Sequence, residues 1–123
     1  MRVYPVDLKL IVDRFANFLV SKEIVNLSYA EVEEKAKMKV FTQMWGSTAL
    51  GFIGVGGQAM TEAYTTVCYL YDEKIYGVFF GEKLAYVIKN PNEAFLNDCS
   101  RMEMASQFEV NRYQQDGVEM FIV

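Results

Sequence analysis

The sequence predicts an α+β fold: two N-terminal helices, a three-stranded antiparallel meander, one or two C-terminal helices and a short final strand. Apolar residues in the first third of the chain recur at the i, i+3, i+4, i+7 spacing of a helix with one buried face. The segment from 63 to 89 is instead rich in Tyr, Thr, Val and Phe, which favour strands. With 123 residues the chain fits one domain, which we expect to span residues 1–123.

The first helix is expected to follow Asp7, whose carboxylate can cap the free N–H groups of the first turn, and to end near Lys22. Its apolar positions fall on one face, which we expect to be buried. They are Leu8, Ile11, Val12, Phe15, Phe18 and Leu19.

The start of the second helix is the best marked in the chain. Ser28 can serve as N-cap and Glu31 can return the hydrogen bond, which together make a capping box. We predict a helix from Tyr29 to Met44, because an apolar stripe continues well beyond the cap. The stripe consists of Val32, Ala36, Val40 and Met44.

Three strands are predicted next: Ala63 to Tyr71, Lys74 to Phe80 and Lys83 to Lys89. Asp72-Glu73 makes the first turn. Gly81-Glu82 places glycine at the first central position of a two-residue loop, as a type II′ turn requires. The three strands should therefore form an antiparallel meander.

Another helix start follows at Asn90, where Asn is a good cap and Pro91 occupies a position at which its missing N–H costs nothing. This helix should run to about Arg101 and cover the meander with one face. The residues of that face are Phe95, Cys99 and Met102. A less regular helical stretch from Ala105 to Tyr113 and a final strand from Val118 to Val123 complete the prediction.

Composition excludes several kinds of chemistry. The chain has no histidine, which removes Ser-His-Asp and Cys-His catalysis and every His-ligated metal site. Cys68 and Cys99 form no C-x-x-C pair, and we interpret them as two small buried hydrophobes in a reducing compartment. No spacing indicates a pair of carboxylates for acid–base work. We expect no metal and no cofactor.

The charge distribution bears on partners. Residues 1–61 carry seven Lys or Arg and six Asp or Glu, whereas residues 62–123 carry five and ten, so the second half has a net charge of −5. No basic cluster exists for a nucleic-acid backbone, so we expect no direct nucleic-acid binding. No apolar run is long enough to span a membrane and no signal peptide is apparent, which predicts a cytoplasmic location.

A glycine-rich passage before the first predicted strand is the main candidate site, since five of the eight glycines lie between Gly46 and Gly57. Glycine lets backbone N–H groups approach an anion closely, but the pattern is neither a Rossmann nor a Walker motif. The alternative is that these glycines only make turns and close packing. The candidate ligand- or partner-binding residues are Trp45, Phe52, Gly54, Gly56, Gly57 and Gln58, with Tyr64 and Tyr76 of the strands.

Aromatic side chains form a second feature, because rings would line both faces of the predicted strands. They are Tyr64, Tyr69, Tyr71, Tyr76, Phe79, Phe80 and Tyr86. Rings can stack on nucleobases, but without accompanying Arg and Lys we favour core packing on one face and protein contact on the other.

The leading hypothesis is a small, acidic, non-enzymatic module that binds another protein with a basic surface and forms a homodimer through the aromatic sheet or the glycine passage. One form of it is an inhibitor that occludes a basic nucleic-acid-binding surface. The alternative is a protein that binds a nucleotide-like or other anionic small molecule at residues 46–58. An enzyme is the least favoured class. Replacing Gly56 and Gly57 with Ala should lower both stability and self-association.

Overall fold

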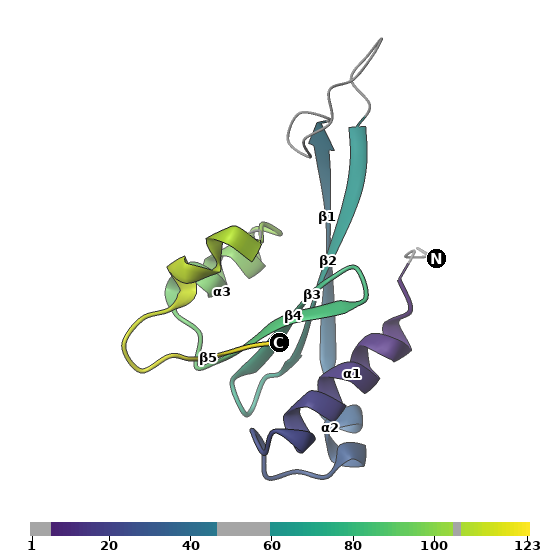
Figure 1. Ribbon diagram of the computed structural model, residues 1–123, viewed down its shortest axis with the longest axis vertical. Helices are drawn as coiled ribbons and strands as arrows, with labels where there is room; N and C mark the ends of the chain where they lie inside the picture. Colours follow the sequence, from purple (N-terminus) through teal and green to yellow (C-terminus); the bar gives the residue numbers. More distant parts are fainter. Residues whose placement is uncertain (1–5, 47–59, 105–106) are drawn as a thin grey trace.

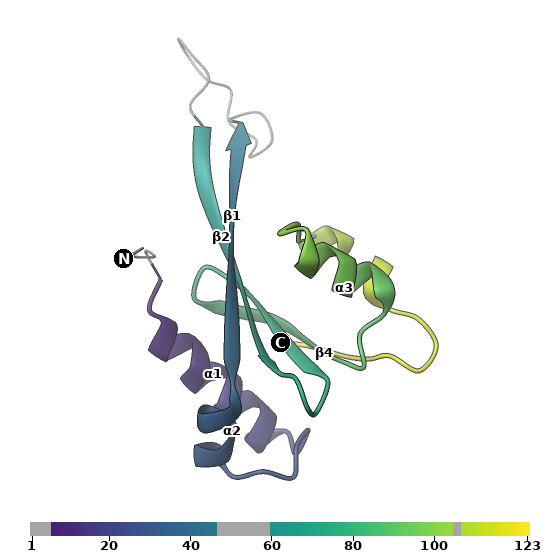
Figure 2. The ribbon, with the colours of Figure 1, turned by 180° about the vertical axis from the view of Figure 1, so that it is seen from behind.

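The computed structural model describes residues 6–46, 60–104 and 107–123. The described elements are α1 (Leu8–Ser21), α2 (Tyr29–Lys35), β1 (Lys37–Gly46), β2 (Met60–Leu70), β3 (Ile75–Phe80), β4 (Lys83–Lys89), α3 (Glu93–Ser100), the 3-10 helix η1 (Gln107–Tyr113) and β5 (Glu119–Ile122). The strands form an antiparallel sheet in the order β1-β2-β3-β4-β5. Figures 1 and 2 show α1 and α2 on one side of this sheet and α3 on the other. The α+β class is confirmed.

Helix α1 agrees closely with its prediction. The Asp7 carboxylate accepts a hydrogen bond from the backbone N–H of Leu10 at 3.1 Å, and the helix ends with Lys22 as C-cap. Ile11, Phe15 and Leu19 are fully buried and form one core between α1, α2 and the sheet. The sheet contributes Cys68, Leu70, Ile75, Phe79, Leu84 and Val87 to this core.

The second helix starts as predicted but is much shorter, and the prediction of helix from 37 to 44 is wrong. The capping box is present, with Glu31 N donating to Ser28 Oγ at 3.2 Å and Ser28 N donating to a Glu31 carboxylate oxygen at 3.1 Å. At Ala36 the backbone turns extended, and β1 begins at Lys37.

The strand is favoured at this point because β1 pairs with β2 along its whole length, from Lys37↔Tyr69 to Gly46↔Met60. Met38 packs into the core beneath α1, while Phe41 is fully buried on the opposite face of the sheet. Side chains that alternate between the two faces of a sheet have the period of a strand. The pairing of β1 with β2 therefore overrides the local helix propensity of these residues.

The predicted meander is confirmed as β2-β3-β4, and β1 and β5 extend it at both edges to five strands. Phe80 pairs with Lys83 across the two-residue loop, and Gly81 has the positive φ of +61° that the turn requires. Beyond Val78 the pairing of β3 with β4 shifts at a β-bulge.

Helix α3 begins two residues later than predicted, because Asn92 rather than Asn90 is its cap. The Asn92 side chain accepts from Phe95 N at 3.0 Å, whereas Asn90 N still donates to Lys74 O at the end of the β3–β4 hairpin. The prediction that Met102 covers the sheet is also wrong, since this side chain is 50% exposed. A second core lies on this face and contains Phe41, Val67, Val78, Tyr86, Ile88, Phe95, Met104 and Tyr113.

One part of the sheet extends beyond its neighbours. β2 pairs with β3 only from Thr65 to Leu70, so the five pairs from Thr42↔Tyr64 to Gly46↔Met60 join β1 and β2 alone. We refer to residues 42–46 and 60–64 as the arm. Figure 1 shows the arm rising past the rest of the sheet, away from α1 and α2.

Candidate binding site

The residues predicted as a site do not come together in the described part of the chain. Five of them lie outside the described residues: Phe52, Gly54, Gly56, Gly57 and Gln58. The predicted effect of replacing Gly56 and Gly57 therefore stays a prediction.

Trp45 and Tyr64 belong to the arm, whereas Tyr76 lies in β3 opposite Tyr69. Trp45 pairs with Thr61, and the eight residue steps of β2 from Thr61 to Tyr69 correspond to about 27 Å of strand. Trp45 and Tyr76 therefore lie far apart on the sheet.

Tyr76 is part of a groove over the strands β1 to β3 and the helix α3. One end of the groove is lined by Lys39, Val67, Tyr69, Tyr71, Tyr76, Leu96, Cys99 and Ser100. A second hollow shares Tyr71, Tyr76 and Leu96 with it and continues past Asp72 and Lys74 to Asn90 and Pro91. We refer to the two together as the tyrosine groove.

The floor of the tyrosine groove is a fixed arrangement of rings. Tyr69 and Tyr76 are cross-strand partners and stack with their centroids 5.3 Å apart and their planes 14° apart. Tyr76 also meets the buried ring of Phe95 edge to face at 5.4 Å. Offset and edge-to-face pairs are the favourable geometries of aromatic rings, so these side chains are held in place before any ligand arrives.

The rim of the tyrosine groove is unusually apolar for a surface. Tyr71 is 70% exposed and Leu96 is 43% exposed, and both line the two hollows. Tyr71 and Tyr76 belong to the aromatic set for which the sequence predicts core packing on one face and protein contact on the other. Lys39 and Leu96 were not predicted as site residues, because Lys39 was placed in a helix and α3 was interpreted only for its buried face, to which Cys99 was assigned.

The Cys99 thiol and the Tyr76 hydroxyl of the tyrosine groove have raised pKa values. Lys39 Nζ donates to the backbone oxygen of Cys99 and lies 5.4 Å from the ring centroid of Phe41. Burial raises the pKa of the Cys99 thiol to about 11, against a smaller lowering by Lys39, and burial also raises the pKa of Tyr76. Both groups are therefore neutral at physiological pH, and the groove offers rings and hydroxyls rather than a nucleophile.

Cys68 is a small buried side chain, as predicted, whereas Cys99 is only half-buried and lines the tyrosine groove. Cys68 is fully buried beneath α1, and burial raises its pKa to about 12. Both thiols are free, and Cys99 Sγ lies 3.9 Å from Met104 Sδ. A thiol whose pKa is raised in this way is a poor nucleophile.

A carboxyl pair that the sequence did not reveal lies on the opposite side of the sheet. Asp13 of α1 accepts a hydrogen bond from the Tyr29 hydroxyl at 2.8 Å and shares another with Glu33 of α2. The Tyr29 bond is the largest cause that lowers the pKa of Asp13, whereas the bond to Asp13 raises the pKa of Glu33. No residue spacing signals this pair, since it depends on how α1 packs against α2. It lies at the surface and joins the two helices.

Comparison with known protein families, with characterised protein sequences and with solved structures found no match. The site must therefore be interpreted from its own geometry.

Two further features bear on that interpretation. Across residues 6–46, 60–104 and 107–123, no group of three or more His, Cys, Asp or Glu residues could hold a metal ion. Within the same ranges, no helix is long and apolar enough to cross a membrane. The tyrosine groove is an ordered aromatic surface, and the interaction it suits is the packing of another molecule's apolar groups.

Proposed function

We propose that this chain is a cytoplasmic, non-enzymatic protein-binding module and that its partner binds in the tyrosine groove. The observation that carries the proposal is the exposure of Tyr71 and Leu96 beside a prearranged ring floor. Tyrosine is enriched at protein interfaces and has few torsions to immobilise, so it contributes contact area at a small entropic cost. An apolar side chain of the partner would lie between Tyr71 and Leu96, on the ring of Tyr76.

The partner class follows from charge. The chain carries −4 overall and −5 in residues 62–123, which supply most of the groove. Asp72, Glu73 and Glu93 are exposed near its open end, although Lys74 lies among them. A negative surface of this kind steers basic partners, so the proposed partner presents apolar side chains on a basic surface. An inhibitor that occludes a nucleic-acid-binding surface is the specific form of this proposal.

Self-association is proposed through the arm. Isolated two-stranded ribbons are marginally stable in water, and the arm has no third strand in the described sheet. Packing of the arm, which carries Trp45, against a second copy would supply the missing support. The proposed assembly is a homodimer whose two tyrosine grooves remain open to a partner.

The experiment compares two apolar side chains of similar exposure. Leu96 is 43% and Met102 is 50% exposed, but Met102 lines neither hollow of the groove. A partner is first captured from native cells with the wild-type chain and purified. Its affinity is then measured by calorimetry for the wild type and for Tyr71→Ala, Leu96→Ala and Met102→Ala.

Loss of a central aromatic contact at an interface costs about 2 kcal/mol or more, so Tyr71→Ala should weaken binding at least tenfold. Leu96→Ala should also weaken it, and Met102→Ala should not. Equal affinities for all three variants would refute the groove as the contact. Affinity that is the same in 0.1 M and 1 M salt would remove the basic partner and the inhibitor form of the proposal.

The anionic small molecule considered as the alternative would bind at residues 46–58, of which the structure describes only Gly46. No observation on the described residues favours it over the groove. A thermal-shift panel of nucleotides would reveal such a ligand, since saturation at 100 times the Kd adds about 2.7 kcal/mol of stability.

A further inference from the structure

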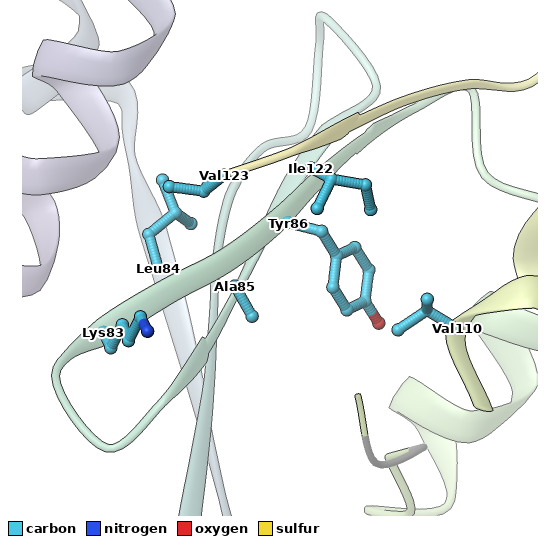
Figure 3. A pocket seen from close by; sticks show the side chains of 7 residues that line it. All are labelled: Lys83, Leu84, Ala85, Tyr86, Val110, Ile122 and Val123. Carbon is cyan, nitrogen blue, oxygen red and sulfur yellow. The ribbon is translucent and has the colours of Figure 1, made fainter. Parts of the chain in front are cut away.

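A second hollow lies on the same face of the sheet as the tyrosine groove, but over β4 and β5 rather than β1 to β3. It has a volume of about 250 Å³ and is lined by Lys83, Leu84, Ala85, Tyr86, Val110, Ile122 and Val123. Figure 3 shows Val110 of η1 facing β4 and β5 across it. We refer to it as the Tyr86 hollow.

The Tyr86 hollow contains a polar group that the described fold leaves without a partner. The side chain of Tyr86 is 1% exposed, and its buried hydroxyl makes no hydrogen bond within the described structure. In Figure 3 this hydroxyl points away from β4, toward Val110. A buried hydroxyl without a partner is costly, and the large majority of buried side-chain polar atoms have a hydrogen-bond partner.

The neighbouring tyrosine shows what a satisfied hydroxyl looks like in this core. Tyr113 is equally buried and 6.4 Å from Tyr86 between ring centroids, and its hydroxyl donates to Asp98. The hydroxyl of Tyr86 has no such carboxylate. Burial raises the pKa of Tyr86 far above its ordinary value of 10, so its hydroxyl keeps its proton and is available as a donor.

The rest of the lining is apolar except at its edge. Leu84, Ala85, Val110, Ile122 and Val123 supply hydrocarbon, and among the side chains described around the hollow the one charged group is that of Lys83, which is exposed. An apolar hollow with one placed polar group is the usual composition of a site for a small molecule.

We propose that the Tyr86 hollow binds a small apolar molecule that carries one carbonyl group. The carbonyl oxygen accepts the hydrogen bond from Tyr86, and the hydrocarbon body packs against Ala85, Val110 and Ile122. The site is separate from the tyrosine groove, so it can be occupied whether or not a protein partner is bound.

The test uses two probes of nearly equal shape, acetophenone and ethylbenzene, of which only the first has a carbonyl. Each is titrated into the full chain and followed by the backbone amide NMR signals of Val110 and Ile122. Acetophenone should bind the wild type more tightly than ethylbenzene. In Tyr86→Phe the affinity for acetophenone should fall about fivefold, the value of one net hydrogen bond, and the affinity for ethylbenzene should not change.

The melting temperature of Tyr86→Phe gives an independent readout. A hydroxyl without a partner contributes nothing to the ligand-free fold, so the variant should melt at the wild-type temperature or above it. A second variant, Ala85→Leu, fills the hollow while it keeps the hydroxyl, and it should bind neither probe.

The proposal is overturned if acetophenone fails to shift the signals of Val110 and Ile122, or if Tyr86→Phe binds both probes as the wild type does. It is also overturned if Tyr86→Phe melts several degrees lower, because the hydroxyl would then have a partner within the fold. Should Tyr86→Phe fail to fold, unchanged binding of acetophenone to Ala85→Leu would overturn the proposal as well.

Discussion

Gly77 lies in the middle of β3, beneath the ring of Phe15 of α1. A Cβ built at this position would lie 2.7 Å from Phe15 Cδ1 and 2.8 Å from Phe15 Cε1, with Leu84 Cδ1 at 3.4 Å. Phe15 is fully buried between α1 and the sheet, so its ring has little room to withdraw. Glycine is therefore required here by the distance between a helix and a strand.

The cost of Gly77→Ala can be worked from these distances. The added methyl would be about 0.7 Å inside ordinary van der Waals contact with the Phe15 ring. Overpacking of this kind typically costs 1–3 kcal/mol, partly offset by about 0.5–1 kcal/mol because alanine loses less backbone entropy than glycine on folding. We expect a net loss of roughly 1–2 kcal/mol in the free energy of unfolding, measured by urea denaturation at pH 7.

The decisive assay is a double-mutant cycle with Phe15→Leu, a smaller side chain that makes room for the methyl. If the clash is the cause, Gly77→Ala should cost at least 1 kcal/mol less in the Phe15→Leu background. Gly117→Ala is the matched control, since Gly117 has nothing within 4 Å of an added Cβ and only its φ of +84° resists alanine. The costs of Gly117→Ala and Phe15→Leu should add. Additive costs for Gly77→Ala and Phe15→Leu, within about 0.5 kcal/mol, would refute the packing argument.

Two further predictions concern polar contacts between elements. Tyr113→Phe removes the hydroxyl that donates to the Asp98 carboxylate, which also accepts from Arg112, and should lower the free energy of unfolding in urea by about 1.5–3 kcal/mol. The control Tyr71→Phe, at an exposed tyrosine, should cost almost nothing. Equal costs for the two variants would contradict the hydrogen bond between Tyr113 and Asp98. The pKa of Glu33 is raised above 4.5, chiefly by its hydrogen bond to Asp13. The folded chain therefore holds a proton on Glu33 that the unfolded chain releases. The stabilisation of the fold by this protonated carboxyl is lost as the pH rises above 4.5. Glu33→Gln keeps a donor at every pH and should gain stability relative to the wild type between pH 4.5 and 7; a constant difference would refute the shared hydrogen bond.

The parts of the fold that the sequence predicts correctly are those that short-range chemistry determines. Asp7 and Ser28 each mark a helix start because the side chain bonds an N–H three residues on. Gly81 marks a hairpin because it tolerates a positive φ. Each of these signals is complete within four residues, so no knowledge of the rest of the chain is needed.

β1 could not be predicted by the same means. Its residues carry an apolar stripe at helical spacing, and Lys, Met and Gln favour helices as single residues. The strand state depends on pairing between Lys37 and Tyr69, which are far apart in the sequence. The same limit hid the tyrosine groove, because Lys39 and Cys99 meet only when β1 is a strand at the edge of the sheet and α3 lies across it.

The two faces of the sheet differ in a way that explains where the candidate sites lie. Beneath α1 the core side chains that β2 to β4 contribute, such as Cys68, Phe79 and Val87, are buried, and Gly77 lets the ring of Phe15 lie close against β3. On the other face α3 has only eight residues, about 12 Å of helix, and it leaves Tyr69, Tyr76 and Phe80 half-buried. The tyrosine groove lies to one side of this short helix and the Tyr86 hollow lies below η1. A helix long enough to cover the face would bury both, so the shortness of α3 is the structural reason that the two hollows stay open. Substitutions beneath α1 should accordingly change stability, whereas Tyr71→Ala and Leu96→Ala at exposed positions of the tyrosine groove should change the proposed binding with little effect on stability.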